Sequence, residues 1–346
     1  MPQILVSDTI RAVKRGERHA HFNKLLLDRM EETLGGGGQA MLFQNRRGFA
    51  PYVECRECGW TARCPDCNVT LTLHKGSGRM VCHYCGHTEP VPAKCPHCRV
   101  TEPVPMGFGT EKVEEEIARV FPEARVARLD RDSVTSERAF RQIVEAFARG
   151  DDDILVGTQM ITKGFDFGGV ELVGVLNADN LLNNPDFRSA ERAFQLLMQV
   201  AGRAGRHGDQ GRVVIQTRLP EDPLFGALEK QDYRGFAESL VEERKENWCV
   251  PFVHQALVTA QAKTLAEALY FLNACAKSGF SMAPEDVRVF DPVPMPLVRL
   301  MDVERAQLLV EADGRASLNR FLWQWQATFN APSGIDWTIE VDPASI

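Results

Sequence analysis

Eight of the ten cysteines lie between residues 55 and 98, and their spacing is typical of metal binding. They form four Cys-x-x-Cys pairs: Cys55/Cys58, Cys64/Cys67, Cys82/Cys85 and Cys95/Cys98. A two-residue spacer lets both thiolates of a pair point at one metal, and two pairs complete a tetrahedral four-thiolate zinc site. The cluster therefore predicts two structural zinc ions, with none of its cysteines left over.

The distances between the pairs suggest which of them share a metal. Fourteen residues separate Cys67 from Cys82, close to the roughly 15–20 residues of a zinc ribbon. The sequential alternative would join Cys58 to Cys64 through only five residues, which is tight for two opposed turns. We therefore expect a nested arrangement, with Cys64, Cys67, Cys82 and Cys85 on one zinc and Cys55, Cys58, Cys95 and Cys98 on the other.

Disulfide bonds are the other use of such a cluster. The N-terminus has no basic flank leading into an apolar stretch, so we expect no secretory signal. A reducing compartment favours metal over disulfides. Because closed four-thiolate sites leave no open position for substrate, these zinc ions are expected to hold structure. Cys249 and Cys275 stand apart from the cluster and are predicted to be ordinary buried thiols.

A second group of residues suited to chemistry is the segment Gln199–Arg206, which reads QVAGRAGR. Arg203 and Arg206 are three residues apart, so on a helical turn they share a face. Guanidinium groups stay charged and form bidentate pairs with phosphate oxygens. The segment is therefore a candidate phosphate site, and a surface arginine pair at a helix end is the alternative.

The elements around these groups alternate between strands and helices. The first part predicts strands at 40–43, 125–129, 154–156, 172–176 and 213–215, with helices at 22–34, 113–121, 140–147 and 190–200. Such alternation favours a parallel sheet covered on both faces. The last part predicts strands at 255–260, 287–291, 306–311 and 336–342, with helices at 264–278 and 316–328. This β-α-β-β-α-β order is ferredoxin-like.

The pattern divides the chain as follows: an α/β domain over 1–54 and 105–218, a two-zinc insertion over 55–104, a helical connector over 219–249 and an α+β domain over 250–346. The length of 346 residues suits two to three domains. A net charge of −7 excludes a wholly basic nucleic-acid coat, although a basic groove on an acidic body is compatible with it. No apolar run approaches the ~18 residues of a membrane span.

Several segments resemble known helicase motifs. Residues 158–167 resemble motif V, and residues 199–206 resemble motif VI, of superfamily-two helicases. Residues 45–51, 107–111 and 186–192, together with the eight-cysteine insertion, strengthen the match. Over essentially its whole length the chain is similar to the C-terminal half of the primosomal replication-restart helicases, the PriA family. The resemblance implies a second RecA-like helicase lobe that carries the zinc insertion.

The resemblance also implies roles for individual residues. Arg206 is expected to be an arginine finger on the γ-phosphate of ATP, with Arg203 and Gln199 beside it. Gly164 and Asp166 are expected to line the nucleotide. The residues expected to meet DNA are Thr158, Gln159, Lys163, Arg46 and Arg47.

At the level of the whole protein, the family resemblance implies an ATP-driven 3′→5′ DNA helicase that recognises stalled forks and restarts replication. The implied partners are forked and single-stranded DNA, the tail of the single-stranded DNA-binding protein, primosome proteins and the replicative helicase loader. The expected setting is a monomer in the bacterial cytoplasm, associated with the nucleoid and not with a membrane.

Two helicase motifs are missing from the sequence. It contains no G-x-x-x-x-G-K-[ST] and no DEAH-type acidic motif. Both belong to a first helicase lobe, so we expect a fragment that binds ATP and Mg²⁺ only together with that lobe and does not hydrolyse ATP alone. The alternative is a zinc-dependent module that docks protein or DNA without a nucleotide role.

Overall fold

The computed structural model describes residues 2–344 apart from 45–51, 56, 59, 68, 75–77, 83–84, 107–108, 131–132, 135, 163–166, 183–185 and 206–210. By their contacts, the residues form two units. The first unit joins Met1–Ala50 to Gly107–Ser239, and the second joins Pro51–Met106 to Leu240–Ile346. The two units are described separately below.

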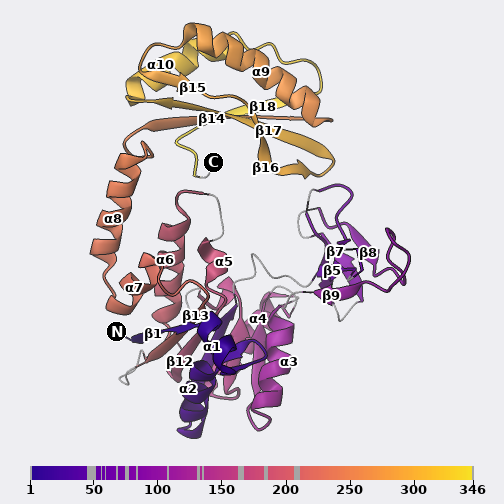
Figure 1. The fold of residues 1–346 in the computed structure, drawn as a ribbon, viewed down its shortest axis with the longest axis vertical. Helices are drawn as coiled ribbons and strands as arrows, with labels where there is room; N and C mark the ends of the chain where they lie inside the picture. The colour runs from indigo at the N-terminus through magenta and orange to yellow at the C-terminus, as the bar shows by residue number, and fades with distance from the viewer. Residues whose placement is uncertain are drawn as a thin grey trace. The chain divides into compact units, whose positions relative to one another are not determined.

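The first unit is built on a six-stranded sheet whose described strands all pair in parallel (Figure 1). In sheet order, the strands are β1 (Gln3–Asp8), β13 (Arg212–Thr217), β12 (Val170–Leu176), β4 (Gln39–Gln44), β11 (Ile154–Gly157) and β10 (Val126–Leu129). All six residues of β4 are buried, which explains why its sequence is an apolar run rather than an alternating one.

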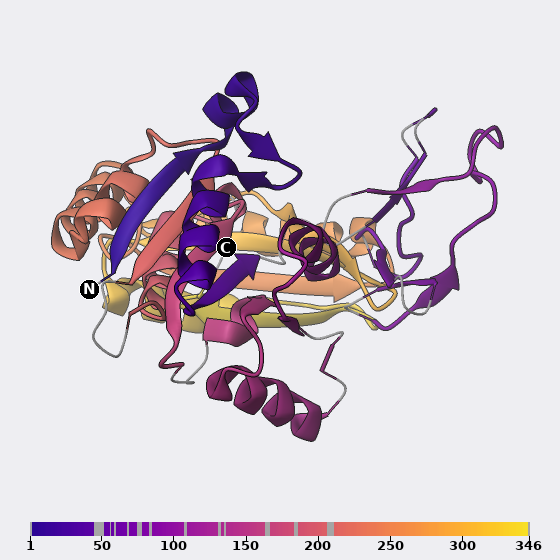
Figure 2. The ribbon, with the colours of Figure 1, turned by 90° about the horizontal axis from the view of Figure 1, so that it is seen from below.

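Helices lie on both sides of this sheet (Figure 2). The main ones are α2 (Lys24–Gly35), α3 (Thr110–Val120), α4 (Glu137–Arg149), α6 (Ser189–Ala201) and α7 (Pro223–Lys230). Leu26 and Met30 of α2 and Ile117 of α3 pack into one apolar cluster with the strands. The short elements are α1 (Thr9–Arg15), β2 (Arg18–His19), β3 (Phe22–Asn23), α5 (Asp179–Leu182) and the 3₁₀ helix η1 (Gln159–Thr162). The expected RecA-like architecture with a parallel sheet is confirmed.

Two features of this unit differ from the sequence prediction. Strand β1 was not predicted, because its apolar run is only Ile4, Leu5 and Val6, yet it pairs with β13 along its whole length. The predicted connector 219–249 contains α7, which packs on β1, and α8 (Tyr233–Glu246). Phe236 of α8 stacks on Phe194 with ring centroids 4.8 Å apart. Part of the connector therefore belongs to the first unit, because apolar residues on its helices are buried there.

The cysteine-rich insertion is a small module of short strands. Its ends are joined by antiparallel pairing of β5 (Tyr52–Glu54) with β9 (Val104–Met106). A three-stranded sheet contains β6 (Thr72–His74), β7 (Arg79–Val81) and β8 (Thr88–Pro90). Its buried cluster consists of Val53, Ala62, Cys64, Cys67, Leu71, Leu73, Met80 and Cys82.

The C-terminal domain has an antiparallel sheet in the order β15-β17-β14-β18, which is the ferredoxin-like order that the sequence predicted. Its elements are β14 (His254–Ala262), α9 (Leu265–Met282), β15 (Val287–Val289), β16 (Val293–Leu300), β17 (Val303–Ala312), α10 (Arg315–Gln326) and β18 (Asp336–Val341). Strand β16, which pairs with β17, was not predicted, because Pro294 and Pro296 interrupt its pattern.

Side chains outside the candidate sites also test the prediction. Cys275 is buried as predicted, and burial raises the pKa of its thiol to about 12. The prediction was wrong for Cys249, which is only half-buried because it follows α8 at the surface. Trp325 is fully buried and Trp323 is 76% exposed, so one lies in the core and one in solvent. Among the described residues, no helix is long and apolar enough to cross a membrane.

Candidate functional sites

Each Cys-x-x-Cys pair begins with the same backbone hydrogen bond. The N–H of the first cysteine donates to a carbonyl five or six residues later: Cys55 to Trp60, Cys64 to Val69, Cys82 to His87 and Cys95 to Thr101, at 2.8–2.9 Å. This bond closes the chain into a tight turn. Gly86 and Arg99, which follow the second cysteines of two pairs, have positive φ angles of 79° and 60°. The local sequence thus folds each pair into a turn that presents both sulfurs on one side.

The turns bring the cysteines together in two groups of four. Within each group, the Sγ atoms all lie within 4.8 Å of one another. The groups are Cys55, Cys58, Cys95 and Cys98, and Cys64, Cys67, Cys82 and Cys85, which is the nested arrangement. The Sγ atoms of Cys55 and Cys98, Cys58 and Cys95, and Cys64 and Cys85 are 3.5–3.6 Å apart. A Zn–S bond of ~2.3 Å gives a tetrahedral edge of about 3.8 Å, so both groups fit zinc.

The metal-free thiols differ in acidity within each group: the pKa is lowered at Cys55 but raised at Cys58, and raised at Cys64 but lowered at Cys85 by the His87 N–H. The Thr101 hydroxyl, 3.4 Å from Cys55 Sγ, lowers the pKa of that thiol to about 6. Burial raises the pKa of Cys64 to about 12. Because zinc binds thiolates, metal binding at the second group must displace protons from its thiols. The sequence analysis did not single out Thr101, whose signal is its place six residues after Cys95.

The helicase-like segments lie against each other in the first unit. Gly157, the last residue of β11, leads directly into η1; a Cβ there would lie 2.3 Å from the Ile161 side chain, so the turn requires glycine. Helix α6 packs against η1. After α6, the N–H of Gly205 donates to the carbonyl of Val170 at 2.9 Å, where β12 begins. Residues 158–162 and 199–205 are therefore positioned by strands of the same sheet.

The described candidate residues differ in exposure. Thr158 and Arg203 are buried, at 6% and 7% exposure, whereas Gln159 and Gln199 are exposed. The sequence did not point to Gly211, which packs so closely that a Cβ there would lie 2.4 Å from the Ala204 backbone. The candidates that lie outside the described residues are Arg46, Arg47, Lys163, Gly164, Asp166 and Arg206.

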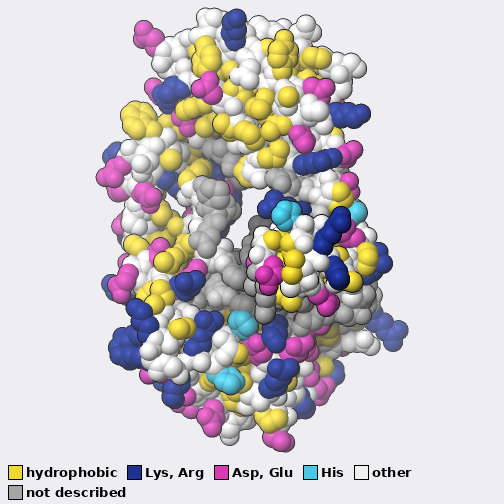
Figure 3. All heavy atoms as spheres, turned by 45° about the vertical axis from the view of Figure 1, so that its right-hand side comes forward, with side chains coloured by type: hydrophobic (Ala, Val, Ile, Leu, Met, Phe, Trp, Pro, Cys, Tyr) yellow, Lys and Arg dark blue, Asp and Glu magenta, His cyan; other side chains and the backbone are white. Residues whose placement is uncertain are grey.

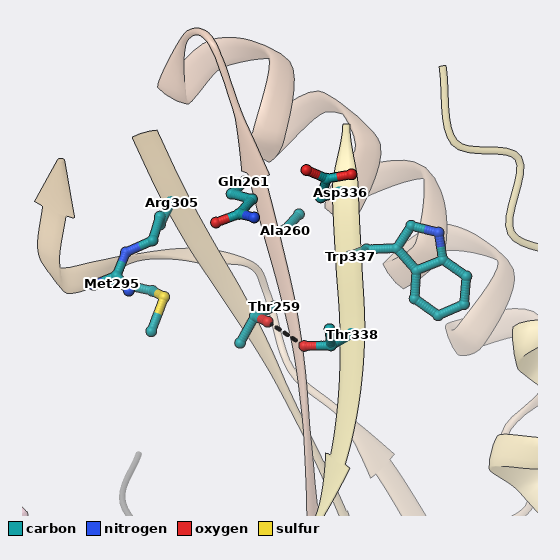
Figure 4. Close-up of a pocket in the computed structure, with 8 residues that line it drawn as sticks. All are labelled: Thr259, Ala260, Gln261, Met295, Arg305, Asp336, Trp337 and Thr338. Atoms are coloured by element: carbon teal, nitrogen blue, oxygen red, sulfur yellow. Dashed lines mark hydrogen bonds between the residues drawn. The ribbon is translucent and has the colours of Figure 1, made fainter. Parts of the chain in front are cut away.

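A cavity of about 150 Å³ opens on the sheet of the C-terminal domain (Figure 4). Its walls come from β14, β16, β17 and β18. The Thr259 and Thr338 hydroxyls are bonded across it at 2.8 Å, and Arg305 donates to the carbonyl of Leu297. The Thr259, Thr338 and Arg305 side chains are thus hydrogen-bonded within the sheet.

On the face drawn in Figure 3, the coloured Lys and Arg side chains are interspersed with those of Asp and Glu.

Comparisons with known proteins match three family models. Residues 64–90 match the PriA DNA helicase Cys-rich region (CRR) domain, residues 108–208 the helicase conserved C-terminal domain, and residues 245–344 the primosomal protein N C-terminal domain. The replication restart protein PriA of Bacillus subtilis (strain 168) is 40% identical over 322 residues, which is 93% of this chain and 40% of that protein. The chain belongs to the PriA family.

Further relatives agree with this PriA assignment. PriA of Haemophilus influenzae is 39% identical over 94% of this chain and 45% of that protein. PriA of Synechocystis is 36% identical over 100% of this chain and 42% of that protein. The chain thus spans less than half the length of these PriA relatives.

Similarity to solved structures is weak. The Pyrococcus furiosus Hef helicase domain aligns with a TM-score of 0.30 and 19% identity over 64% of this chain and 30% of that one. The assignment of the lobe therefore depends on its family match and its strand order.

Proposed function

We propose that the chain is the C-terminal part of an ATP-dependent 3′→5′ DNA helicase that restarts replication at stalled forks. The supporting observation is that the η1 segment and the segment after α6, which carry the helicase-like motifs, pack together in a lobe of a PriA-family chain. In the proposal, a first lobe with a glycine-rich phosphate loop binds ATP and Mg²⁺. This sequence has no such loop, so the chain alone does not hydrolyse ATP.

The residue roles follow from the motif positions. Arg206 meets the γ-phosphate, while Arg203, buried at the end of α6, and Gln199 support that end of the segment. Gly164 and Asp166 border the nucleotide. The proposed DNA contacts are Thr158, Gln159, Lys163, Arg46 and Arg47.

The proposal extends to the setting of the complete protein. Its partners are forked and single-stranded DNA, the single-stranded DNA-binding protein tail, primosome proteins and the helicase loader. It acts as a monomer in the bacterial cytoplasm at the nucleoid. Two zinc ions in the four-cysteine groups serve structure, because four sulfurs leave no open coordination position.

The test is the Arg206→Ala substitution in the complete protein. Loss of an arginine finger lowers turnover by about 10³- to 10⁵-fold in related NTPases, and we expect DNA-stimulated ATP hydrolysis to fall in that range. The matched control is Arg141→Ala, which removes an exposed guanidinium 2.6 Å from Glu137 on α4 and is expected to leave the rate unchanged. An unchanged rate in Arg206→Ala contradicts the proposal and favours the zinc-dependent docking module.

A further inference from the structure

The turn between β16 and β17 has an unusual backbone. Met301 and Asp302 form a two-residue turn, and both have positive φ angles, of 50° and 64°. Such turns usually contain Asn or Gly, since other residues pay a steric penalty in this region. The Met301 side chain is 61% exposed, so side-chain packing does not explain the residue. The functional part of the turn is its backbone.

The two turn N–H groups bind the cysteine-rich module, which lies in the same contact unit. Met301 N–H donates to Cys67 Sγ at 3.5 Å, and Asp302 N–H donates to the Asp66 carbonyl at 3.1 Å. Next to them, Leu300 packs against the buried cluster of the module. Successive residues of the turn therefore meet successive residues of one Cys-x-x-Cys pair.

The hairpin is braced in this position. Arg299 and Asp302 form an ion pair across the turn, 2.5 Å between Nη2 and Oδ1. Arg305 donates two hydrogen bonds, of 3.2 and 2.8 Å, to the Leu297 carbonyl, where the register of β16 against β17 shifts. These bonds fix the arms of the hairpin, so its turn N–H groups keep a set direction.

A sulfur that binds zinc is an anionic acceptor, and an N–H group aimed at it stabilises the bound form. Partners in this outer shell orient the ligands, and their loss typically weakens metal binding about 10- to 100-fold. Both cysteine groups receive N–H groups from their own turns, and each has one further donor from a different place. Cys55 has the Thr101 hydroxyl of its own module, whereas Cys67 has an N–H of the C-terminal domain.

We propose that the β16–β17 turn is a positioning element for the zinc site formed by Cys64, Cys67, Cys82 and Cys85. By linkage, metal at this site in turn holds the hairpin on the module. The other zinc site is independent of the C-terminal domain. Leu300 supplies the apolar contact and Met301 the hydrogen bond.

The first experiment measures zinc release from the zinc-loaded full chain into an excess of a colorimetric zinc chelator, which changes colour as it binds the released metal. Leu300→Ser is expected to speed the release of one of the two zinc ions about 10- to 100-fold and to leave the other unchanged. The matched control is Val293→Ser at the other end of β16, where the side chain is 47% exposed. It is expected to leave the release rates of both zinc ions unchanged. Equal release of both ions at the wild-type rate in Leu300→Ser overturns the proposal.

The second experiment leaves the hairpin sequence intact, so its result does not depend on whether Leu300→Ser folds. Hydrogen exchange of the turn amides is compared in zinc-loaded wild type, Cys67→Ser and Cys98→Ser. Exchange at Met301 and Asp302 is expected to accelerate at least tenfold in Cys67→Ser and to stay at the wild-type rate in Cys98→Ser. Identical exchange at the turn in all three chains overturns the proposal.

Discussion

The helicase lobe and the cysteine-rich module are stabilised by different means. The lobe has a six-stranded sheet with helices on both sides, and its core needs no metal. The module has a core of eight residues, of which three are themselves cysteines of one group. A core of this size does not stabilise a domain without metals or disulfides. The chain therefore contains one part that folds by burying apolar residues and another part that folds by binding metal.

Removal of both zinc ions is expected to produce the largest difference between the two parts. Structural zinc contributes about 10–16 kcal/mol of apparent binding free energy in small zinc modules, so we expect the module to unfold and its eight thiols to become reactive. The lobe is expected to keep its far-UV circular dichroism. All five tryptophans lie outside the lobe, so tryptophan fluorescence reports on the second unit alone. If the circular dichroism of the lobe is lost at the same time as the thiols become reactive, the lobe also depends on zinc and our account is wrong.

The converse test creates a cavity in the core of the lobe and leaves the zinc sites unchanged. Phe147 is fully buried and packs edge-to-face on Phe167, with centroids 5.2 Å apart. Phe147→Ala is expected to lower the free energy of unfolding of the lobe by about 3–5 kcal/mol, measured by urea and circular dichroism. Zinc content per chain should stay the same. The control Val13→Ala shortens a side chain of α1 in the lobe that is 55% exposed and should change stability by less than about 0.5 kcal/mol.

The cap at the start of α4 is expected to make a smaller contribution to the free energy of unfolding of the lobe. Ser136 Oγ accepts a hydrogen bond from the Ala139 N–H at 3.2 Å and caps the helix. Ser136→Ala is expected to cost about 1 kcal/mol in the same urea titration, whereas Ser136→Thr keeps the acceptor oxygen and most of the stability. Equal losses in both variants would show that the cap bond contributes nothing.

The smallest expected effect depends on pH. Hydrogen bonds from Arg125 lower the pKa of Asp153, where β10 and β11 begin. A lowered folded-state pKa means that the pair stabilises the lobe above the unfolded-state value of about 3.9 and loses that effect as pH falls through the folded-state value. Because the pair is partly exposed, Asp153→Asn should cost no more than about 1 kcal/mol at pH 7. If the stability lost in Asp153→Asn does not become smaller below pH 4, the ion pair with Arg125 is not its cause.

The sequence was most informative where spacing alone determines geometry. Four Cys-x-x-Cys pairs with a fourteen-residue central gap predicted two nested groups, and the structure brings the same eight sulfurs together. The alternation of strands and helices likewise predicted the parallel sheet of the lobe and the strand order of the C-terminal domain. These patterns are local, so periodicity and counting suffice to read them.

What the sequence could not predict depends on contacts between distant residues. Strand β1 exists because β13 and α7 cover it, and its three apolar residues alone do not signal a strand. Strand β16 contains prolines that argue against a strand, yet β17 pairs with it at both ends of a register shift. The hydrogen bond from Met301 to Cys67 joins residues 234 positions apart, which no local pattern records.

The difference between the two parts is tested most directly in the complete protein, by measuring DNA-stimulated ATP hydrolysis and duplex unwinding before and after zinc is stripped. Our account predicts that unwinding is lost while most of the ATP hydrolysis remains, because the segments that we propose to face the nucleotide belong to the lobe and not to the zinc module. Equal loss of both activities would contradict it, since the zinc ions would then support the whole fold.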